Sequence, residues 1–392
     1  MQSKWPFWDD FIGFCQQLIR TPSLSGEEKD VAELYKKKMG DLHYDDVWID
    51  HVGNVIGVKK GEKAKPSICF TAHMDHVDPG AESGWEYPPY SGVIADGYIH
   101  GRGTSDLKGP GATQVYIPML LEYYNISHGD IYIIQVVHEE TGGLGSMMLE
   151  KGILDRLDYA INGEPTSNMV KVGHRGRIEL KITFKGQSVH ASTPEKGVNP
   201  LYEVAVFLSG LRNLPMAADK IESSTVAPTV CYTDQKSSNV TPGACELRLD
   251  WRNIPGETEA DVLSKIRQLL PHSSDIDIPE YKLQSYTGRT FTLKRVKKPF
   301  SIEPKHPLVS AVVSATRDTL NREVTISRWS CGTDCPYFMD AGIPIVGFSP
   351  AEMNYLHTSK ERISIKLIQD AMESYPHIIS NINKLPKCNN RS

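Results

Sequence analysis

The stretch IYIIQVV at residues 131–137, followed at once by HEETGG at residues 138–143, decides the fold class. Its first seven residues form a short apolar run, which predicts a strand buried on both faces. A helical pattern and further β-rich runs precede it, and such alternation predicts an α/β domain with helices around a mixed, largely parallel sheet. The earlier runs are residues 47–50, 54–59 and 67–72, and the helical pattern covers residues 109–124.

Local signals support further elements of this domain. Ser25 and Glu28 have the spacing of a capping box, which predicts the start of a helix. The pair Asp96-Gly97 predicts a hairpin turn. Late in the chain, we expect a helix at residues 306–321 and a strand at residues 343–348.

The middle of the chain has a different order of elements. From residue 177 the pattern is strand, helix, strand, strand, helix, strand, which is the ferredoxin-like arrangement. We therefore predict an α+β domain at residues 177–290, inserted into a domain formed by residues 1–176 and 291–392. The predicted strands are residues 177–185, 225–233, 244–252 and 275–284, and the predicted helices are residues 199–214 and 258–270.

Composition excludes several classes of protein. The 392 residues carry 43 basic and 48 acidic side chains, a net charge of −5, which argues against a nucleic-acid partner. Apolar residues make up 40% and charged residues 23%, as in globular proteins, and the length suits two or three domains. No apolar run is long enough to span a bilayer, and the first residues lack the apolar core of a secretory signal. We therefore expect a cytoplasmic protein with no membrane partner.

The seven cysteines form no CxxC pair, and their number is odd. Cys331 and Cys335 are four residues apart, which suits a metal, but no second Cys or His pair accompanies them. Reduced thiols in a reducing compartment are the simpler interpretation.

Five acid or imidazole motifs lie just after apolar strands or in loops rich in turn residues. Sites in open α/β sheets form beyond the carboxyl ends of the strands, so these side chains can converge. Taken singly, each is more simply a solvated loop residue, and the glycine-rich loop lacks the GxxxxGK[ST] pattern of a phosphate site. Their joint order is what indicates a single site. The motifs are His73 in HMD, Asp106 in GRGTSDLKG, Glu139 and Glu140 in EETGG, Glu164 in NGEPT and His357 in YLHT.

These motifs, in this order, resemble those of the co-catalytic zinc hydrolases. That family includes acetylornithine deacetylase, succinyl-diaminopimelate desuccinylase, aminoacylase, glutamate carboxypeptidases and several dipeptidases. The resemblance runs from about Ile19 to Ile365, and GRGTSDLKG and EETGG are its most specific pieces. The stretch from Gly173 to Ala191 looks most like a branch of uncharacterised hydrolases linked to purine or selenium metabolism. The resemblance implies a metallopeptidase domain, with the inserted domain as a lid through which a homodimer forms.

The resemblance further implies two zinc ions per chain. His73 and Glu164 would hold one ion, Glu140 and His357 the other, and Asp106 would bridge both. Imidazole and carboxylate ligands suit zinc, although cobalt or manganese can bind the same set. Three carboxylates against two divalent cations leave a positive site, which favours a deprotonated bridging water.

Three further residues would serve catalysis: Glu139 and His190 by the same resemblance, and Asp75 by its position two residues after His73. Glu139 would be the general base that moves a proton from the water to the leaving amine. Asp75 would accept the second N–H of His73. His190, in GQSVHASTP, would hydrogen-bond the developing oxyanion, and in this family such a histidine often comes from the partner subunit. A hydrogen-bonded loop histidine is the alternative for His190.

Four residues are candidates for substrate recognition. Arg252 offers a planar fork for a carboxylate and Asn239 offers an amide, although a surface salt bridge also explains Arg252. Gly332 and Thr333 offer loop donors, and a simple tight turn fits them equally. Several branches of the family carry an arginine in this loop where the present chain has Pro336. A charge for a second acidic group of the substrate is therefore missing at that position.

The sequence thus predicts a metal-dependent hydrolase that cleaves the amide bond of an N-acyl amino acid or short peptide, in the manner of a deacetylase or desuccinylase. The first alternative is a di- or tripeptidase or a carboxypeptidase of the same family, and comparing dipeptides with acyl amino acids separates them. The second is a binding protein that lacks catalysis, and the joint presence of five ligands and a base argues against it.

Overall fold

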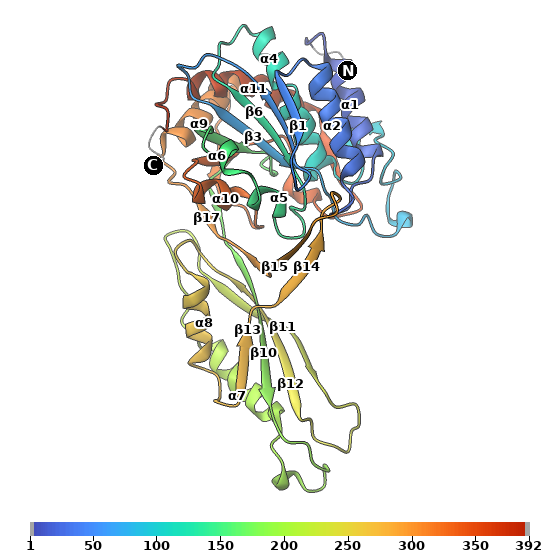
Figure 1. The fold of residues 1–392 in the computed structure, drawn as a ribbon, viewed down its shortest axis with the longest axis vertical. Helices are drawn as coiled ribbons and strands as arrows, with labels where there is room; N and C mark the ends of the chain where they lie inside the picture. The colour runs from blue at the N-terminus through green and yellow to red at the C-terminus, as the bar shows by residue number, and fades with distance from the viewer. Residues whose placement is uncertain (1–3, 389–392) are drawn as a thin grey trace.

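The computed structural model describes residues 4–388 as a large upper body and a smaller body that hangs below it (Figure 1). The first and last helices, α1 and α11, both lie in the upper body. The chain leaves this body through a long strand and returns to it after completing the lower one. This is the connectivity of an inserted domain.

The upper body is built on an eight-stranded sheet. In order across the sheet, its strands are β1 (Asp46–Ile49), β2 (Val55–Lys59), β6 (Ile131–Val136), β3 (Ile68–His73), β7 (Tyr159–Asn162), β19 (Ile345–Gly347), β8 (Val170–Lys171) and β18 (Ile326–Ser327). The central strands β6, β3, β7 and β19 run parallel, whereas β1 and β2 extend the sheet in antiparallel pairs. β3 and β6 are buried along their whole length, as apolar sequences in a covered sheet should be. The predicted mixed, largely parallel sheet is confirmed.

Helices cover this sheet and complete one apolar core. α2 packs on β1 and β2, α3 on β3 and β6, α9 on β8 and β19, and α11 on α3, α4 and α9. The helices are α1 (Trp8–Arg20), α2 (Lys29–Asp41), α3 (Gly109–Val115), α4 (Ile117–Tyr123), α5 (Leu144–Met147), α6 (Lys151–Leu154), α9 (Pro307–Leu320), α10 (Cys335–Asp340) and α11 (Ile365–Ile382). Small sheets are formed by β4 (Ile94–Ala95), β5 (Tyr98–His100) and β20 (Arg362–Ser364), and by β9 (Gly173–His174) and β17 (Phe300–Ser301).

Some elements predicted for the upper body agree with the structure and others differ from it. The hairpin turn at Asp96-Gly97 is confirmed, with both residues at positive φ. The helix predicted at residues 109–124 is instead two helices, since Tyr116 leaves the helical conformation just before Pro118, which lacks an N–H. α11 is not among the predicted elements, although its buried residues recur at helical spacing.

The predicted capping box is wrong. Ser25 donates its hydroxyl to Asp75 Oδ2 at 2.6 Å, far from its own helix in sequence. Glu28 is buried and accepts the backbone N–H of Gly26 at 3.0 Å and of His138 at 3.1 Å. Ser25 therefore ties the start of α2 to the loop after β3, and Glu28 ties it to the loop after β6. Spacing along one helix does not reveal either role.

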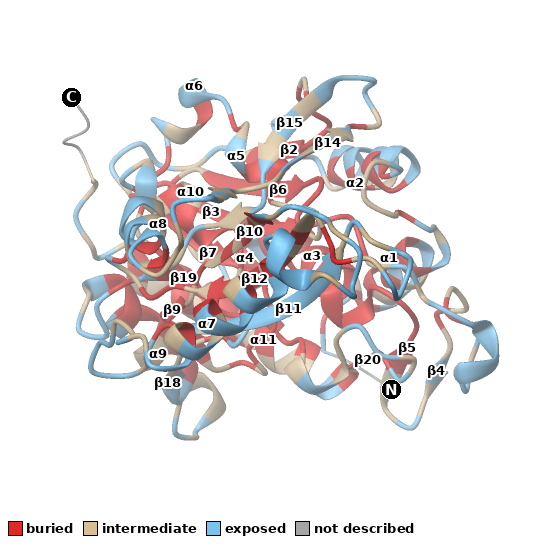
Figure 2. Ribbon diagram, turned by 90° about the horizontal axis from the view of Figure 1, so that it is seen from below, coloured by how far each residue is buried: buried red, intermediate tan, exposed pale blue. Residues whose placement is uncertain are grey.

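The lower body is an α+β domain with its own core. Its sheet has the order β11 (Thr225–Thr233), β12 (Ala244–Arg252), β10 (Arg177–Lys185) and β13 (Ser274–Asp277), and β16 (Val296–Lys297) also pairs with β10. The helices α7 (Pro200–Arg212) and α8 (Glu259–Arg267) contribute buried side chains to this core, together with β10 and β12. Seen from below, α7 and β11 present exposed residues to the viewer (Figure 2).

The single strand predicted at residues 275–284 is wrong. Its first part is β13, whereas its second part, β14 (Glu280–Gln284), pairs with β15 (Thr290–Lys294) in a separate hairpin. Pro279 lies between the two parts and cannot donate to a ladder. The hairpin reaches back to the upper body: the hydroxyl of Tyr281 donates to the carbonyl of Thr141, and that of Tyr286 to the carbonyl of Gly53 at 2.8 Å.

Among residues 4–388, no helix is both long and apolar enough to cross a membrane.

Candidate active site

The parallel strands at the centre of the sheet bring the predicted ligands together. His73 is the last residue of β3, and it stands in register with Val136 at the end of β6. Glu139 and Glu140 follow β6, and Glu164 follows β7 by two residues. Since the carboxyl ends of neighbouring parallel strands meet at one edge of the sheet, these acids and His73 converge there.

Asp106 lies between two histidines that come from distant parts of the chain. Its Oδ1 is 3.0 Å from His73 Nε2, and its Oδ2 is 3.1 Å from His357 Nε2. Glu164 Oε1 lies 3.8 Å from His73 Nε2, and Glu140 Oε1 lies 3.0 Å from His357 Nε2. All five predicted metal ligands therefore meet at one place, with Asp106 in the central position.

Asp75 contacts the loop after β6 more closely than it contacts His73. Its Oδ1 accepts the backbone N–H of Glu139 at 3.0 Å, and its Oδ2 accepts that of Glu140 at 3.1 Å. His73 Nδ1 is 2.9 Å from the backbone carbonyl of Asp75, while the nearest carboxylate oxygen is 3.5 Å away. The second N–H of His73 thus goes to a carbonyl, and the Asp75 carboxylate orients the Glu139–Glu140 backbone.

Glu361 is a buried acid of the site that the sequence analysis misses. Its Oε1 accepts the backbone N–H of Ser105 at 3.0 Å and of Asp106 at 3.1 Å. Its Oε2 accepts from the guanidinium of Arg102, which is buried as well. A glutamate four residues after His357 was the available signal, but its partners lie about 250 residues earlier in the chain.

The charges of the cluster fit bound cations. Burial and the nearby Asp106 raise the pKa of Glu140 to about 7. Burial and the nearby Glu139 raise the pKa of Glu164 well above its usual value. Burial and the neighbouring acids both disfavour the ionised form of these groups, and cations bound among them would favour it. Two groups of possible ligands overlap at His73, and within each group the ligand atoms lie within 4.8 Å of one another. One group is His73, Asp106 and Glu140, and the other is His73, Glu139 and Glu164. Imidazole and carboxylate donors in such groups suit zinc, cobalt or manganese.

Glu139 carries an ion pair that the sequence does not predict. Lys297, on β16, places Nζ 2.7 Å from Glu139 Oε1, and its side chain is 25% exposed. Nearby, Asp334 is buried, and burial together with Glu139 raises its pKa to about 7. Lys297 is therefore the cation in direct contact with the predicted base.

The four candidate substrate residues are not brought together within one chain. Arg252 forms a salt bridge with Asp250, with Nε 2.6 Å from Oδ1. This is the salt bridge that the sequence offered as the other explanation for Arg252. The backbone N–H of Thr333 donates to His174, and Gly332 lies against the Lys297 side chain. Asn239 is exposed on the inserted domain.

Asn239 is close to His190 instead. The two lie in facing segments at the far end of the inserted domain, where His190 bridges to Val240 and the Asn239 carbonyl accepts from Ala191. The nine residues of β10, which span about 30 Å, separate this end from the upper body. Neither side chain is near the ligand cluster of its own chain.

The fold and the site together define a hydrolase with a metal-binding cluster at its strand ends and an inserted α+β domain. The profile of peptidase family M20/M25/M40 matches residues 69–381, and the chain belongs to this family. Enzymes of the family depend on a dinuclear metal centre, and the chain is a hydrolase of amide or peptide bonds.

Its relatives span nearly the whole chain. It is 28% identical over 365 residues to the uncharacterised protein YgeY of Escherichia coli (strain K12), covering 90% of this chain and 89% of YgeY. It is 27% identical over 383 residues to succinyl-diaminopimelate desuccinylase of Aliarcobacter butzleri (strain RM4018), covering 94% and 99%. The crystal structure of aminopeptidase PepT from Bacillus cereus ATCC 10987 has the same fold, with a TM-score of 0.79, 21% identity and coverage of 96% and 99%.

Proposed function

We propose that the chain is a zinc-dependent amidohydrolase that cleaves the amide bond of an N-acyl amino acid or a short peptide. The observation that carries the proposal is the position of Asp106, whose two oxygens face His73 and His357 separately. In this role Asp106 would be shared by two ions, with Glu164 and Glu140 completing the set. The bound ions would supply Lewis-acid polarisation of the carbonyl and an acidified water molecule.

Glu139 is the general base in this proposal. Its ion pair with Lys297 uses Oε1. Its other oxygen would take the proton of the attacking water and return it to the leaving amine. Asp75, which accepts the backbone N–H groups of Glu139 and Glu140, would hold the base and the adjacent ligand in their relative positions.

The proposal includes a homodimer in the cytoplasm. Residues 1–176 and 291–392 would form the catalytic domain, and residues 177–290 the lid and dimerisation domain. His190 and Asn239 lie far from their own ligand cluster, so a second chain would have to bring them to it. Exposed apolar side chains on α7, Tyr202 at 73% and Val206 at 70%, offer surface for such an interface.

Amine release from a panel of N-acetyl, N-succinyl and N-formyl amino acids and dipeptides tests the activity. We expect release that stops when a chelator removes the metals, and the preferred member separates a deacylase from a peptidase. Glu139→Gln should lower turnover by about 10²–10⁴-fold with metal content unchanged. Wild-type turnover in this variant would exclude Glu139 as the base.

Mixing two inactive variants tests the contribution of the second chain. In a Glu139→Gln and His190→Ala heterodimer, one site would combine both defects and the other would be intact. Random exchange of chains would then restore about a quarter of wild-type activity if His190 acts across a two-fold interface. If every mixture stays inactive while heterodimers are present, His190 does not act across the interface.

A further inference from the structure

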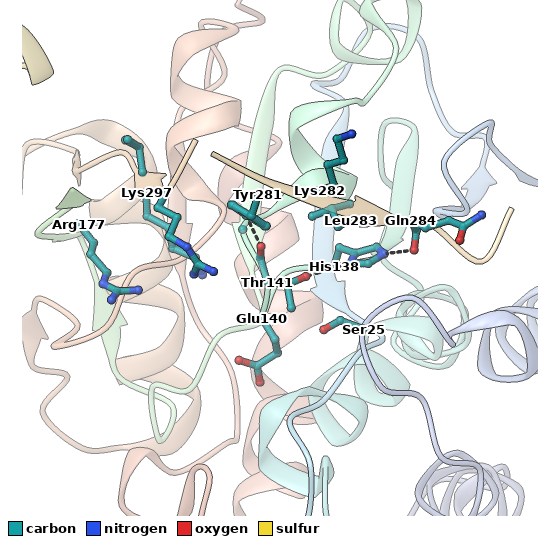
Figure 3. A pocket seen from close by; sticks show the side chains of 13 residues that line it. Ser25, His138, Glu140, Thr141, Arg177, Tyr281, Lys282, Leu283, Gln284 and Lys297 are labelled. Atoms are coloured by element: carbon teal, nitrogen blue, oxygen red, sulfur yellow. Dashed lines mark hydrogen bonds between the residues drawn. The ribbon is translucent and has the colours of Figure 1, made fainter. Parts of the chain in front are cut away.

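A cavity of about 430 Å³ lies between the β14–β15 hairpin and the ligand cluster. Figure 3 shows Arg177 and Lys297 on one side of it in this view, with Glu140 toward the middle. Of its lining residues within the described chain, four are basic and only Glu140 is acidic. The basic ones are Arg177, Lys282, Arg295 and Lys297. The cavity wall therefore carries more basic than acidic side chains.

Two of these cations lie opposite each other on paired strands, and a third lies just before one of these strands. Arg177 on β10 stands directly opposite Lys297 on β16 in the antiparallel register. Arg295 is a bend residue between β15 and β16, and it lines the same cavity as Lys297. Like charges directly opposite each other destabilise a sheet, so this arrangement favours an anion between them.

The acids of the protein leave this positive charge only partly neutralised. Lys297 pairs with Glu139 at 2.7 Å and Arg177 with Asp250 at 2.7 Å, while Arg295 has Glu179 at 3.7 Å. Glu179 is also the partner of Arg248, at 2.8 Å. Arg177 also has Glu179 at 3.8 Å, and Asp250 is shared with Arg252. With Glu246 beside Arg248, four arginines thus face three carboxylates, and an added carboxylate in the cavity would balance this set.

Lys297 also reaches the loop where family branches carry an arginine. A Cβ added at Gly332 would lie 3.2 Å from Lys297 Cδ, so the lysine stem crosses directly over this loop. Pro336, four residues on, carries no charge. An ammonium group has three N–H donors and Glu139 takes one, so Lys297 can bind a second carboxylate without leaving the base.

We propose that Lys297, Arg177 and Arg295 bind an additional carboxylate of the substrate, so that the preferred substrates are amides with an anionic group on the acyl or the amine part. This inference rests on the proposed amide hydrolysis and names its substrate class. Lys297 on β16, the strand by which the chain returns from the inserted domain, thus supplies the positive charge that is missing at Pro336.

Two pairs of equally sized substrates test the proposal. N-succinyl-alanine and N-succinamoyl-alanine differ by one carboxylate on the acyl part, and N-acetyl-glutamate and N-acetyl-glutamine differ by one on the amine part. We expect kcat/KM to favour the acid by about tenfold or more in one pair, as one charge-assisted hydrogen bond provides. The pair that discriminates shows which part of the substrate enters the cavity.

Three variants identify the residues responsible. Lys297→Met and Arg177→Gln should each bring the acid-to-amide ratio of kcat/KM close to one, even if Lys297→Met also slows both substrates. Lys298→Met is the matched control, because Lys298 is half exposed and pairs with Asp340 outside the cavity. Equal rates within both pairs for the wild type, or a ratio unchanged in both cavity variants, would overturn the proposal.

If no substrate is hydrolysed although metals are bound, the proposed function is wrong. Whether the cavity prefers an additional carboxylate can then still be tested by measuring ligand binding. Calorimetry on the zinc-loaded protein would compare glutarate with its monoamide. Tighter binding of glutarate that Lys297→Met abolishes supports the cationic cavity, and equal affinities reject it.

Discussion

Replacing Glu361 with glutamine is expected to weaken metal binding, because Glu361 connects a buried arginine to the backbone that presents Asp106. The carboxylate accepts the N–H groups of Ser105 and Asp106 with one oxygen and the guanidinium of Arg102 with the other. Glutamine keeps one acceptor but turns an NH₂ group toward Arg102. Both side chains are almost completely buried, at 1% and 2% exposure, so water cannot compensate.

The magnitude follows from this geometry. Removing one partner of a buried ion pair costs about 3–5 kcal/mol of folding free energy. Disturbing a residue that holds a metal ligand in place lowers metal affinity by about 10–100-fold. We expect both effects in Glu361→Gln, since the resulting clash with Arg102 would displace the loop that carries Asp106.

Competition with a chromophoric chelator measures the affinity, and thermal unfolding of the metal-free protein measures the stability. Glu323→Gln is the control, because Glu323 is exposed. Adding Arg102→Met to Glu361→Gln removes the buried charge while the glutamine oxygen still accepts the two N–H groups. Both quantities should then move back toward the wild type. If Glu361→Gln binds metals as tightly as the wild type, Glu361 does not position Asp106.

Three further predictions concern stability and the ligand loop. Gly53→Ala should lower the midpoint of thermal unfolding, because φ at Gly53 is +107° and an added Cβ would lie 2.4 Å from the Tyr286 ring. Gly13→Ala is the matched control: Gly13 lies on α1 with open space around it, so this change should raise the free energy of unfolding by about 0.5–1 kcal/mol. Removing the metals with a chelator should lower the midpoint of thermal unfolding, and added zinc should restore it. Free zinc at 100 times its Kd adds about 2.7 kcal/mol to the free energy of unfolding. A midpoint that changes with neither treatment would argue against the metal site. Asp75→Asn should lower turnover by about 10–100-fold, because one N–H of the Glu139–Glu140 pair loses its acceptor, and unchanged kinetics would remove Asp75 from this role.

Most of the fold was accessible from local patterns. β10 and β12 have the bounds that alternation predicts, because every second side chain of each is buried in the core of the inserted domain. β11 also has its predicted bounds, although most of its residues are exposed. The strand predicted across Pro279 fails, although the proline itself is a sequence signal for a break, because it cannot donate to a ladder. That the second part forms a hairpin with β15 is decided by the tertiary structure. The capping box at Ser25 fails because a nearby acid, Asp75, competes for the hydroxyl.

The candidate ligands follow from the order of motifs together with its resemblance to the co-catalytic zinc hydrolases. His73, Glu140 and Glu164 each follow a strand, and parallel strands carry such residues to one edge whatever the details of packing. Asp106 and His357 belong to the same set through their motifs, and the structure brings both to that edge. This much depends on residue type, spacing and chain order, all of which a sequence contains.

Only the tertiary structure decided which charges surround that edge. Lys297 contacts Glu139 across 158 residues, and Glu361 holds the backbone of Asp106 across 255. The separation of His190 from its own ligand cluster likewise follows from the direction in which β10 leaves the upper body. Contacts of this kind arise from how domains and loops pack in three dimensions, and no local period or spacing encodes them.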